Sequence, residues 1–515
     1  MLPTFRNEPY LDFSLGENIE GMRQAFARRK ADADKVNHII INNRPVKAKE
    51  TFVSLNPATE EPVGIFQRGT VKEAGRAMKA AAKAFETWKH VPAIERASVF
   101  LRGARMMRDR RFEFDAAMVL EEGKRWLEAD ADFAEAVDFL EFYAREAIRY
   151  DQVVPVTPFP GESNEVRYIP LGVGVVIPPW NFPCAIMAGM TTAAAVSGNT
   201  VVLKPATDAP LLATLFMDVL LEAGLPPGVV NLLTGPGGGI GDYLVEHPTT
   251  RFISFTGSKE VGLRIFEKAA KVGKDQIWVK RVVAEMGGKD CIIVDSEADV
   301  DAAADGVAAS AFGFQGQKCS ACSRAIVDAK VYDEFCQKAV ARTKELVKTG
   351  PVEDPKYWMG PVINRRAFEQ ILEYVKIGKK EGRLLLGGKK KPGKGYFIEP
   401  TIIADVKRRA RIAQEEIFGP VLAVIKARNY TDALAIANGT EYGLTGAVYT
   451  RNREKILRAK KEFHVGNMYI NRKCTGALVD VQPFGGFNMS GTDSKAGGRD
   501  YLLLFLQAKS MTERF

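Results

Sequence analysis

The sequence predicts an α/β protein with more than one domain. Between residues 171 and 272, short apolar runs alternate with helical patterns, which is typical of parallel strands buried between helices. A second pattern of the same kind begins near residue 291. The chain has 515 residues, which is too many for one core because domains average about 150 residues.

The first part of the chain is predicted to be mainly helical. A helix is expected at residues 17–37, and strands are expected at 38–43 and 51–55. From residue 70 to 150, apolar residues recur at helical spacing, which predicts scaffold helices. Residues 151–166 are rich in proline and extended, so they form either a linker or an excursion that pairs elsewhere.

The two αβ units follow in order. In the first, strands are expected at 171–177, 200–203, 229–233 and 252–255, and helices at 187–197, 209–223, after 241 and from 258 to about 272. In the second, strands are expected at 292–294, 325–327 and 422–425, and helices at 300–312, 331–348 and 367–381. The order predicts parallel sheets covered by helices on both faces. The tail, residues 501–512, is a strand or short helix that pairs with residues 151–166 or with another subunit.

Composition restricts the class of function. The hydrophobic fraction of 46% is that of an ordinary globular protein. The net charge is +9, but the densest basic run, residues 376–395, is laced with glycine and is interpreted as an exposed loop. We expect no nucleic-acid partner, because no recognition motif accompanies the charge. The chain has no apolar run long enough for a membrane and no signal segment, so a cytoplasmic location is expected.

Six cysteines in a chain of this length do not form a disulfide framework. Cys319 and Cys322 make one C-x-x-C pair, but no second pair or nearby histidine completes a structural zinc site, so no metal is expected. Cys322 is interpreted as a packed residue. The alternative is that it traps Cys319 as a disulfide under oxidation.

Cys319 is the candidate nucleophile. It lies in residues 312–324, between a predicted helix and a predicted strand, and its neighbours are Gly, Gln, Lys and Ser. A polar, approachable setting favours ionisation and attack, whereas a structural cysteine usually has apolar neighbours. On cysteine statistics alone, a packed thiol would be favoured.

Two glycine-containing turns and a lysine indicate a nucleotide site. Gly235 and Gly241 bound a run that follows a strand and opens a helix, where backbone N–H groups can face a pyrophosphate. Phe255 to Ser258 repeats the device, with Ser258 as an N-cap, a phosphate contact or both. Lys204 ends a strand on the side where such sheets bind ligands. The alternatives are a flexible turn and a solvated strand end.

Two further residues are candidates for catalysis. Glu285 precedes two glycines, which permit close approach of a ligand or backbone, and it is a candidate general base. Asn181 lies in a rigid turn between two prolines and offers an amide donor for an oxyanion. The plain alternatives are a surface glutamate and ordinary turn chemistry.

Together these segments resemble the aldehyde dehydrogenase superfamily over nearly the whole chain. Seven motifs occur in its order: W-N-F-P at 180–183, a strand ending in K-P at 204–205, F-T-G-S at 255–258, E-M-G-G-K at 285–289, G-Q-K-C at 316–319, E-E-I-F-G-P at 415–420 and P-F-G-G at 483–486. The resemblance implies a Rossmann-type NAD-binding domain (1–150 and 167–286), an α/β catalytic domain (287–495) and a small oligomerisation flap (151–166 and 496–515). It also implies a homodimer or a dimer-based higher oligomer.

The resemblance also implies roles for residues. Cys319 would attack an aldehyde, Asn181 and the Cys319 N–H would hold the oxyanion, and Glu285 would activate water. The cofactor would be held by Lys204, Gly235, Gly241, Phe255, Ser258, Glu416 and Phe418.

The segments 313–320, 475–477 and 485–495 resemble the branch of the family that oxidises L-glutamate γ-semialdehyde in proline catabolism. By that resemblance, the substrate would be held by Ser320, Gly476, Ala477, Phe182, Phe484 and Glu135. Gly476 and Ala477 would bind a carboxylate through backbone N–H groups.

One departure and several rivals remain. Many relatives have glutamate three residues after the lysine, but this chain has Thr207, so some NADP use beside NAD is a hypothesis. The rivals are a dehydrogenase of another semialdehyde, a thioesterase or esterase using Cys319 and Glu285 without redox chemistry, and a non-catalytic paralogue.

Overall fold

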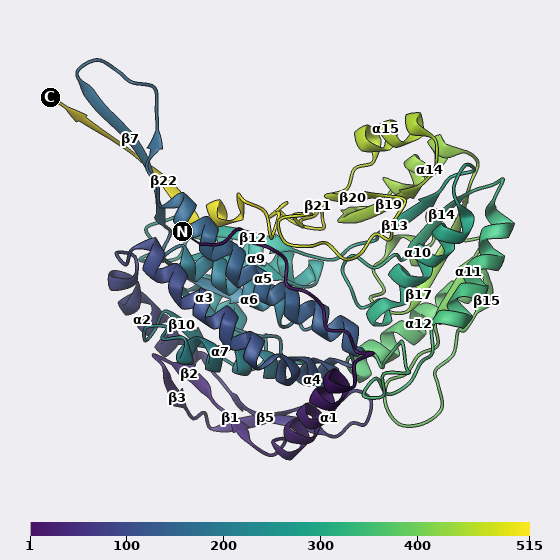
Figure 1. Cartoon of the computed structure of the whole chain (residues 1–515), viewed down its shortest axis with the longest axis horizontal. Coiled ribbons are helices and arrows are strands. Elements are labelled where there is room, and N and C mark those ends of the chain that lie inside the picture. The colour runs from purple at the N-terminus through teal and green to yellow at the C-terminus, as the bar shows by residue number, and fades with distance from the viewer. Residues whose placement is uncertain (1) are drawn as a thin grey trace.

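The computed structural model describes residues 2–515 and shows two lobes, each built on a seven-stranded sheet (Figure 1). A small three-stranded sheet, labelled β7 and β22 in the figure, projects away from the first lobe. A further three-stranded sheet is formed early in the chain by β1 (Val36–Asn37), β4 (Glu50–Leu55) and β5 (Pro62–Arg68). The predicted α/β class is confirmed.

The predicted helical region from 70 to 150 is confirmed as four helices. They are α2 (Val71–Trp88), α3 (Ala93–Asp109), α4 (Arg111–Glu122) and α5 (Trp126–Tyr150). The helix predicted at 17–37 is too long: α1 is Gly16–Ala31. Asp32 ends it and pairs with Lys35, and the next residues pair with β5 as β1.

The first lobe's sheet has the order β12-β11-β8-β9-β10-β2-β3. Five neighbouring strands are parallel: β8 (Val173–Ile177), β9 (Thr200–Leu203), β10 (Val230–Leu232), β11 (Thr250–Thr256) and β12 (Arg281–Glu285). The prediction of a parallel sheet is wrong at one edge, where the hairpin of β2 (Ile39–Ile41) and β3 (Arg44–Val46) joins antiparallel. Asn42 and Asn43, with φ of 56° and 57°, form its turn.

Helices cover both faces of this sheet. Successive side chains of a strand point to opposite faces, and because these strands carry apolar side chains on both faces, each face needs a layer of helices to bury it. Val175 and Val202 pack with α2 and with α8 (Ile240–Glu246). Val176 and Val201 pack on the other side with α6 (Ala185–Val196) and α7 (Leu211–Glu222). The fifth helix of the unit, α9 (Lys259–Ala270), packs on β12.

The second lobe repeats this arrangement. Its sheet, in spatial order, is β15 (Arg383–Leu386), β16 (Thr401–Ala404), β17 (Val421–Ala427), β14 (Arg324–Asp328), β13 (Cys291–Val294), β19 (Thr445–Tyr449) and β20 (Asn467–Ile470). The prediction of a parallel sheet is wrong at one edge here too, because β15 pairs antiparallel with β16. Ile292 faces α10 (Val300–Phe312) and α11 (Tyr332–Leu346). Ile293 faces the other side, with α12 (Arg365–Glu381), α14 (Tyr430–Ala437) and α15 (Arg453–Glu462). The short elements are α13 (Arg411–Gln414), β18 (Tyr442–Gly443) and β21 (Phe487–Asn488).

The projecting sheet settles what the extended segment pairs with. β7 (Glu162–Pro170) pairs antiparallel with β22 (Leu506–Arg514) of the same chain, and β6 (Val154–Pro155) lies on the other side of β7. The tail is a 3₁₀ turn at Tyr501–Phe505 that continues into β22. The role of this sheet in oligomerisation and the domain boundaries given above stay predictions. Within residues 2–515, no helix has the length and apolar character needed to cross a bilayer.

The topology gathers the candidate functional residues at the carboxyl ends of the parallel strands of the first sheet, which we call the cofactor edge. The parallel strands all end there, so the segments after them lie at the same side. The strand β8 leads to Asn181, β9 to Lys204, β10 to Gly235, and β11 to Ser258, while Glu285 is the last residue of β12. This edge faces the segment that crosses to the second lobe.

Gly174 tests the packing between neighbouring strands. A Cβ on this buried glycine of β8 would overlap the Phe252 ring on β11. We expect Gly174→Ala to lower the free energy of unfolding by about 1–3 kcal/mol through overpacking. Gly273→Ala is the control, because its added Cβ meets no atom within 4 Å. Urea unfolding measures both, and equal midpoints for the two variants would contradict the packing argument.

Candidate active site

The candidate nucleophile follows a turn that we call the nucleophile turn, residues Gly313–Gly316. It comes directly after α10, and Phe314 and Gln315 have φ of 47° and 57°, which non-glycine residues rarely adopt. Cys319 comes three residues later with a half-buried side chain, whereas the other five cysteines are buried. The turn therefore presents one thiol that a reagent can reach.

Gly287 and Gly288 bring three functional groups of the site together. A Cβ on Gly287 would overlap the Glu416 carboxylate, and a Cβ on Gly288 would overlap the Cys319 carbonyl oxygen. The Gly288 N–H donates to Glu416 Oε1 at 2.9 Å. Glu285 lies two residues before this pair, at the end of β12. The glycines of the E-M-G-G-K motif are thus needed for close approach.

The electrostatic surroundings of Cys319 differ from the expectation. Burial raises the pKa of the Cys319 thiol well above its usual value, and the charges of Asp290, Glu416 and Glu285 raise it further. The Ser320 N–H acts in the opposite sense. The polar neighbours in the sequence predict an easily ionised thiol, and that expectation is wrong for this arrangement, because burial and the charges of carboxylates distant in the sequence both disfavour the thiolate.

Glu285 is held by hydrogen bonds from a distant loop. Its Oε1 accepts from the Ser494 hydroxyl at 2.7 Å and from the Ser494 N–H at 3.1 Å, and its Oε2 accepts from the Gly486 N–H at 3.0 Å. Burial raises the pKa of Glu285 to about 7, although these bonds and the charge of Lys495 act to lower it. A carboxyl group with this pKa is suited to take up a proton near neutral pH.

Asn181 lies beside the nucleophile. Its side chain is buried, and its Nδ2 donates to the Gln317 carbonyl at 3.0 Å, which leaves the second N–H of the amide for another acceptor. Within residues 2–515, the Cys319 N–H has no acceptor. Two donors are therefore available next to the thiol.

Three of the residues predicted to hold a cofactor, Lys204, Gly235 and Ser258, follow the carboxyl ends of strands of the first sheet, whereas Glu416 and Phe418 come from the second lobe. Lys204 is buried, and burial lowers its pKa to about 8; among residues 2–515, its Nζ donates only to the Pro205 carbonyl, at 3.1 Å. The Thr207 hydroxyl donates to the Gly235 carbonyl at 3.3 Å, which places these two loops together. Ser258 caps α9, with its Oγ accepting from Val261 N–H at 3.4 Å, so the N-cap interpretation is confirmed.

The other predicted cofactor residues differ in their settings. An added Cβ on Gly241 would meet no atom within 4 Å. Phe255 is buried in a cluster with Ile265 and Met286, so its ring packs within the protein. Phe418, with φ of 55°, packs edge-on against Trp180 at 5.5 Å between ring centroids. A cofactor contact of Phe255 stays a prediction.

The segment predicted to bind a carboxylate is Thr475–Ala477, which we call the anchor loop. Its Thr475 and Gly476 carbonyls accept from Arg472 at 2.9 and 3.0 Å. In the described part of the chain, the N–H groups of Gly476 and Ala477 have no acceptor. The Cys474 thiol donates to the Ser320 carbonyl at 3.4 Å, which ties this loop to the nucleophile.

The remaining predicted substrate residues are half-buried. The Phe182 ring lies 6.3 Å from the Phe314 ring in an edge-on arrangement. Phe484 exchanges backbone hydrogen bonds with Ala496. The carboxylate of Glu135 makes no ion pair or hydrogen bond with residues 2–515, and burial raises its pKa to about 8. At neutral pH it is largely protonated unless a cation binds beside it.

Cys322 packs in the core of the second lobe, as predicted. It is buried, and its thiol donates to the Arg324 carbonyl at 3.4 Å. Burial raises the pKa of the Cys322 thiol, and the hydrogen bond and charge of the neighbouring Cys474 raise it further. The structure therefore favours packing over the alternative of a trap for Cys319.

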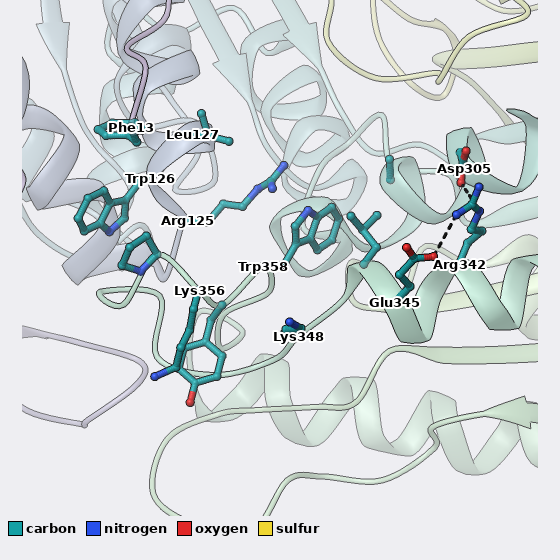
Figure 2. A pocket seen from close by; sticks show the side chains of 14 residues that line it. Phe13, Arg125, Trp126, Leu127, Asp305, Arg342, Glu345, Lys348, Lys356 and Trp358 are labelled. Carbon is teal, nitrogen blue, oxygen red and sulfur yellow. Dashed lines mark hydrogen bonds and ion pairs between the residues drawn. The ribbon is translucent and has the colours of Figure 1, made fainter. Parts of the chain in front are cut away.

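A pocket of about 700 Å³ lies away from these residues (Figure 2). Arg125, Trp126 and Trp358 line it, and the Arg125 guanidinium lies 4.5 Å from the centroid of the Trp358 ring. No predicted site residue lines this pocket. Arg125 also lies 3.6 Å from the Glu128 carboxylate, which contacts the nucleophile turn.

Several residues of the site were not predicted. Ser494 lies inside the segment 485–495, but nothing in the sequence shows that its hydroxyl reaches Glu285. Trp180 was seen as part of a rigid turn, and its packing between Phe418 and Phe314 was not foreseen. Glu128 is one acidic residue on a predicted scaffold helix and carried no signal.

Comparison with known proteins gives consistent results. The model of the aldehyde dehydrogenase family matches residues 45–511. The chain is 55% identical to a 1-pyrroline-5-carboxylate dehydrogenase of Geobacillus sp. (strain WCH70), with all of both chains covered. It is 51% identical to the crystal structure of 1-pyrroline-5-carboxylate dehydrogenase from Thermus with bound NAD, with a TM-score of 0.98 and all of both chains covered. It is 47% identical to proline utilization A from Bdellovibrio bacteriovorus, with a TM-score of 0.97, and 99% of this chain covers 53% of that one.

Alkylation tests the exposure and the charge surroundings of Cys319. We expect iodoacetamide to modify Cys319 before the five buried cysteines. Because the pKa of this thiol is raised, the rate should still be rising above pH 9, where an ordinary cysteine approaches its limit. Peptide mass spectrometry locates the label, and Cys319→Ser is the control. A rate that levels off below pH 8 would contradict the electrostatic argument.

Proposed function

This chain belongs to the aldehyde dehydrogenase family, and from that premise we propose that it oxidises L-glutamate γ-semialdehyde to L-glutamate with NAD. This substrate is the open form of 1-pyrroline-5-carboxylate, and the similar proteins are named as dehydrogenases of that compound. The observation that carries the proposal is the close approach at Gly287 and Gly288, where the Cys319 backbone and the Glu416 carboxylate lie against the segment that follows Glu285, and the charges of both glutamates act on the Cys319 thiol. A nucleophile, a base and a cofactor edge are the parts that this reaction needs.

The residues present fit NAD. Lys204 is a buried ammonium without a carboxylate partner in residues 2–515, and its spare N–H donors suit ribose hydroxyls. An added Cβ on Gly237, Gly238 or Gly239 would meet no atom within 4 Å, so there is open space beside this glycine-rich segment for a ligand. Glu416 and Phe418 would hold the nicotinamide ribose and ring. When bound, NAD supplies the acceptor for the hydride that leaves the carbon held on Cys319.

The first step is addition of Cys319 to the aldehyde. The thiolate forms the C–S bond, and the electron pair of the carbonyl moves to its oxygen. The free N–H of Asn181 and the Cys319 N–H donate to that oxyanion. The thiol first gives its proton to water, and the raised pKa of Cys319 makes this a costly part of the step.

The last step is hydrolysis of the thioester on Cys319. Glu285 accepts a proton from water while the oxygen attacks the thioester carbon. The C–S bond then breaks, the thiolate leaves and the carboxylate product is released. Glu285 accepts hydrogen bonds from Ser494 and from the Gly486 N–H, which fix the position of its carboxylate and favour its ionised form.

The anchor loop accounts for the choice of substrate. The N–H groups of Gly476 and Ala477 would bind the α-carboxylate of the substrate, and the Ser320 hydroxyl would assist. Phe182 and Phe484 would enclose the aliphatic part. Glu135 would ionise when the substrate ammonium lies beside it, because an adjacent cation lowers the pKa of a carboxyl group. We further propose a cytoplasmic enzyme that assembles from dimers through the β6-β7-β22 sheet.

A cofactor-coupled assay tests the proposed function. We expect the protein to reduce NAD with pyrroline-5-carboxylate, and Cys319→Ala to lose at least about 10³-fold of this activity because the nucleophile is gone. Some activity with NADP is also expected, since Thr207 places no carboxylate beside the cofactor ribose. Reduced-cofactor absorbance measures all of these. Reduction with another aldehyde alone would refute the substrate, and ester hydrolysis without any reduction would refute the redox reaction.

The pH dependence tests the role of Glu285. Its pKa is about 7, and only the ionised form accepts a proton, so kcat should fall as the pH drops below about 7. Ser494→Ala removes a donor that stabilises the ionised form, which raises the pKa and moves the acid limb upward by about one unit. Ser494→Thr keeps the hydroxyl and serves as the matched control. An unmoved limb in Ser494→Ala would exclude this coupling.

A further inference from the structure

The nucleophile turn has a strained backbone that its surroundings must hold. Phe314 and Gln315 are consecutive non-glycine residues in the left-handed region, which is an unfavourable backbone conformation for both. Such conformations persist only where other contacts impose them. The turn sets the direction of Cys319 and of its N–H, so the groups that hold it have a direct bearing on the reaction.

The Gln315 side chain holds the middle of the turn. Its Nε2 donates to the carbonyls of Gly123 at 3.0 Å and Pro361 at 2.7 Å, and its Oε1 accepts from the Gly360 N–H at 3.1 Å. These bonds anchor Gln315 to two loops. They do not hold the backbone on either side of it.

Glu128 contacts both ends of the segment. Its Oε2 accepts from the Phe314 N–H at 2.9 Å, and its Oε1 accepts from Lys318 Nζ at 2.8 Å, directly before Cys319. A Cβ on Gly313 would lie 3.0 Å from Glu128 Oε1, so this glycine leaves room for the carboxylate. One side chain from the first turn of α5 therefore bridges residues on both sides of Gln315.

The charge of Glu128 is secured by its partners. Burial alone would raise the pKa of Glu128, but the charges of Lys318 and Arg125 hold it below its usual value. The carboxylate is therefore ionised at neutral pH. Arg125, whose guanidinium points across the pocket wall toward Trp358, is the second cation at this carboxylate (Figure 2).

We propose that Glu128 is a positioning residue for the proposed aldehyde oxidation, acting through Phe314 and Lys318 to fix the direction of Cys319. The proposal rests on the proposed function. Loss of the Phe314 contact lets the strained turn relax, and loss of the Lys318 contact frees a cation next to the thiol. Both changes move the reacting sulfur relative to Asn181.

Three variants test this. We expect Glu128→Ala to lower kcat by about 10- to 100-fold, because small misplacement of a reacting atom has effects of this size. Glu128→Gln should lose less, since its amide oxygen still accepts from the Phe314 N–H. Glu141→Gln is the matched control, because Glu141 lies on the same helix and pairs with Arg108 and Arg145 away from the turn. It should stay within about twofold of wild type.

The measurement is kcat per Cys319 that iodoacetamide can modify, together with the rate of that modification. A residue needed only for folding would change the number of reactive thiols but not kcat per thiol. Equal kcat per thiol and equal modification rates in wild type, Glu128→Gln and Glu128→Ala would overturn the proposal. If wild type and Glu141→Gln oxidise no aldehyde, the proposed function fails. In that case a modification rate in Glu128→Gln at least about fivefold from wild type still supports the positioning role, and an unchanged rate overturns it.

Discussion

The structure of the site depends on the close approach at Gly287 and Gly288. Two backbone positions without side chains let the Glu416 carboxylate and the Cys319 carbonyl lie where a Cβ would otherwise be. The same short segment ends the edge strand of the first sheet at Glu285 and leads into β13 of the second. A larger residue at either glycine would push Cys319 or Glu416 away from the first lobe. The two lobes can therefore approach closely here only because both positions lack a side chain.

Bringing these groups together sets the electrostatics of the site. Burial, together with the charges of Asp290, Glu416 and Glu285, raises the pKa of the Cys319 thiol well above its usual value. The same burial raises the pKa of Glu285 to about 7, where it can exchange protons during turnover. The hydrogen bonds from Ser494 and Gly486 keep that value from rising further. The charge of Glu285, the proposed base, therefore also acts on the pKa of Cys319, the proposed nucleophile.

The two loops that are proposed to contact the substrate are also joined. The Ser320 carbonyl accepts from the Cys474 thiol and from Thr445 Oγ1, so the residue after the nucleophile is fixed to the anchor loop and to β19. On the other side, Glu128 and Gln315 hold the nucleophile turn against the helices of the first lobe. Cys319 therefore lies between two supports that come from different lobes, which favours a fixed distance between its thiol and the anchor loop.

The sequence by itself determined the α/β class, most helices and strands, and the motifs on which the family assignment rests, because hydrophobic periodicity and glycine turns are local signals. It misjudged the end of α1 and the antiparallel hairpin at the sheet edge, where tertiary pairing overrides local pattern. Only the tertiary structure decided that the tail pairs with β7, that Ser494 reaches Glu285, and that Glu128 holds a turn far along the chain. These contacts join residues distant in sequence, and no local pattern records which distant partner a carboxylate or strand edge will meet.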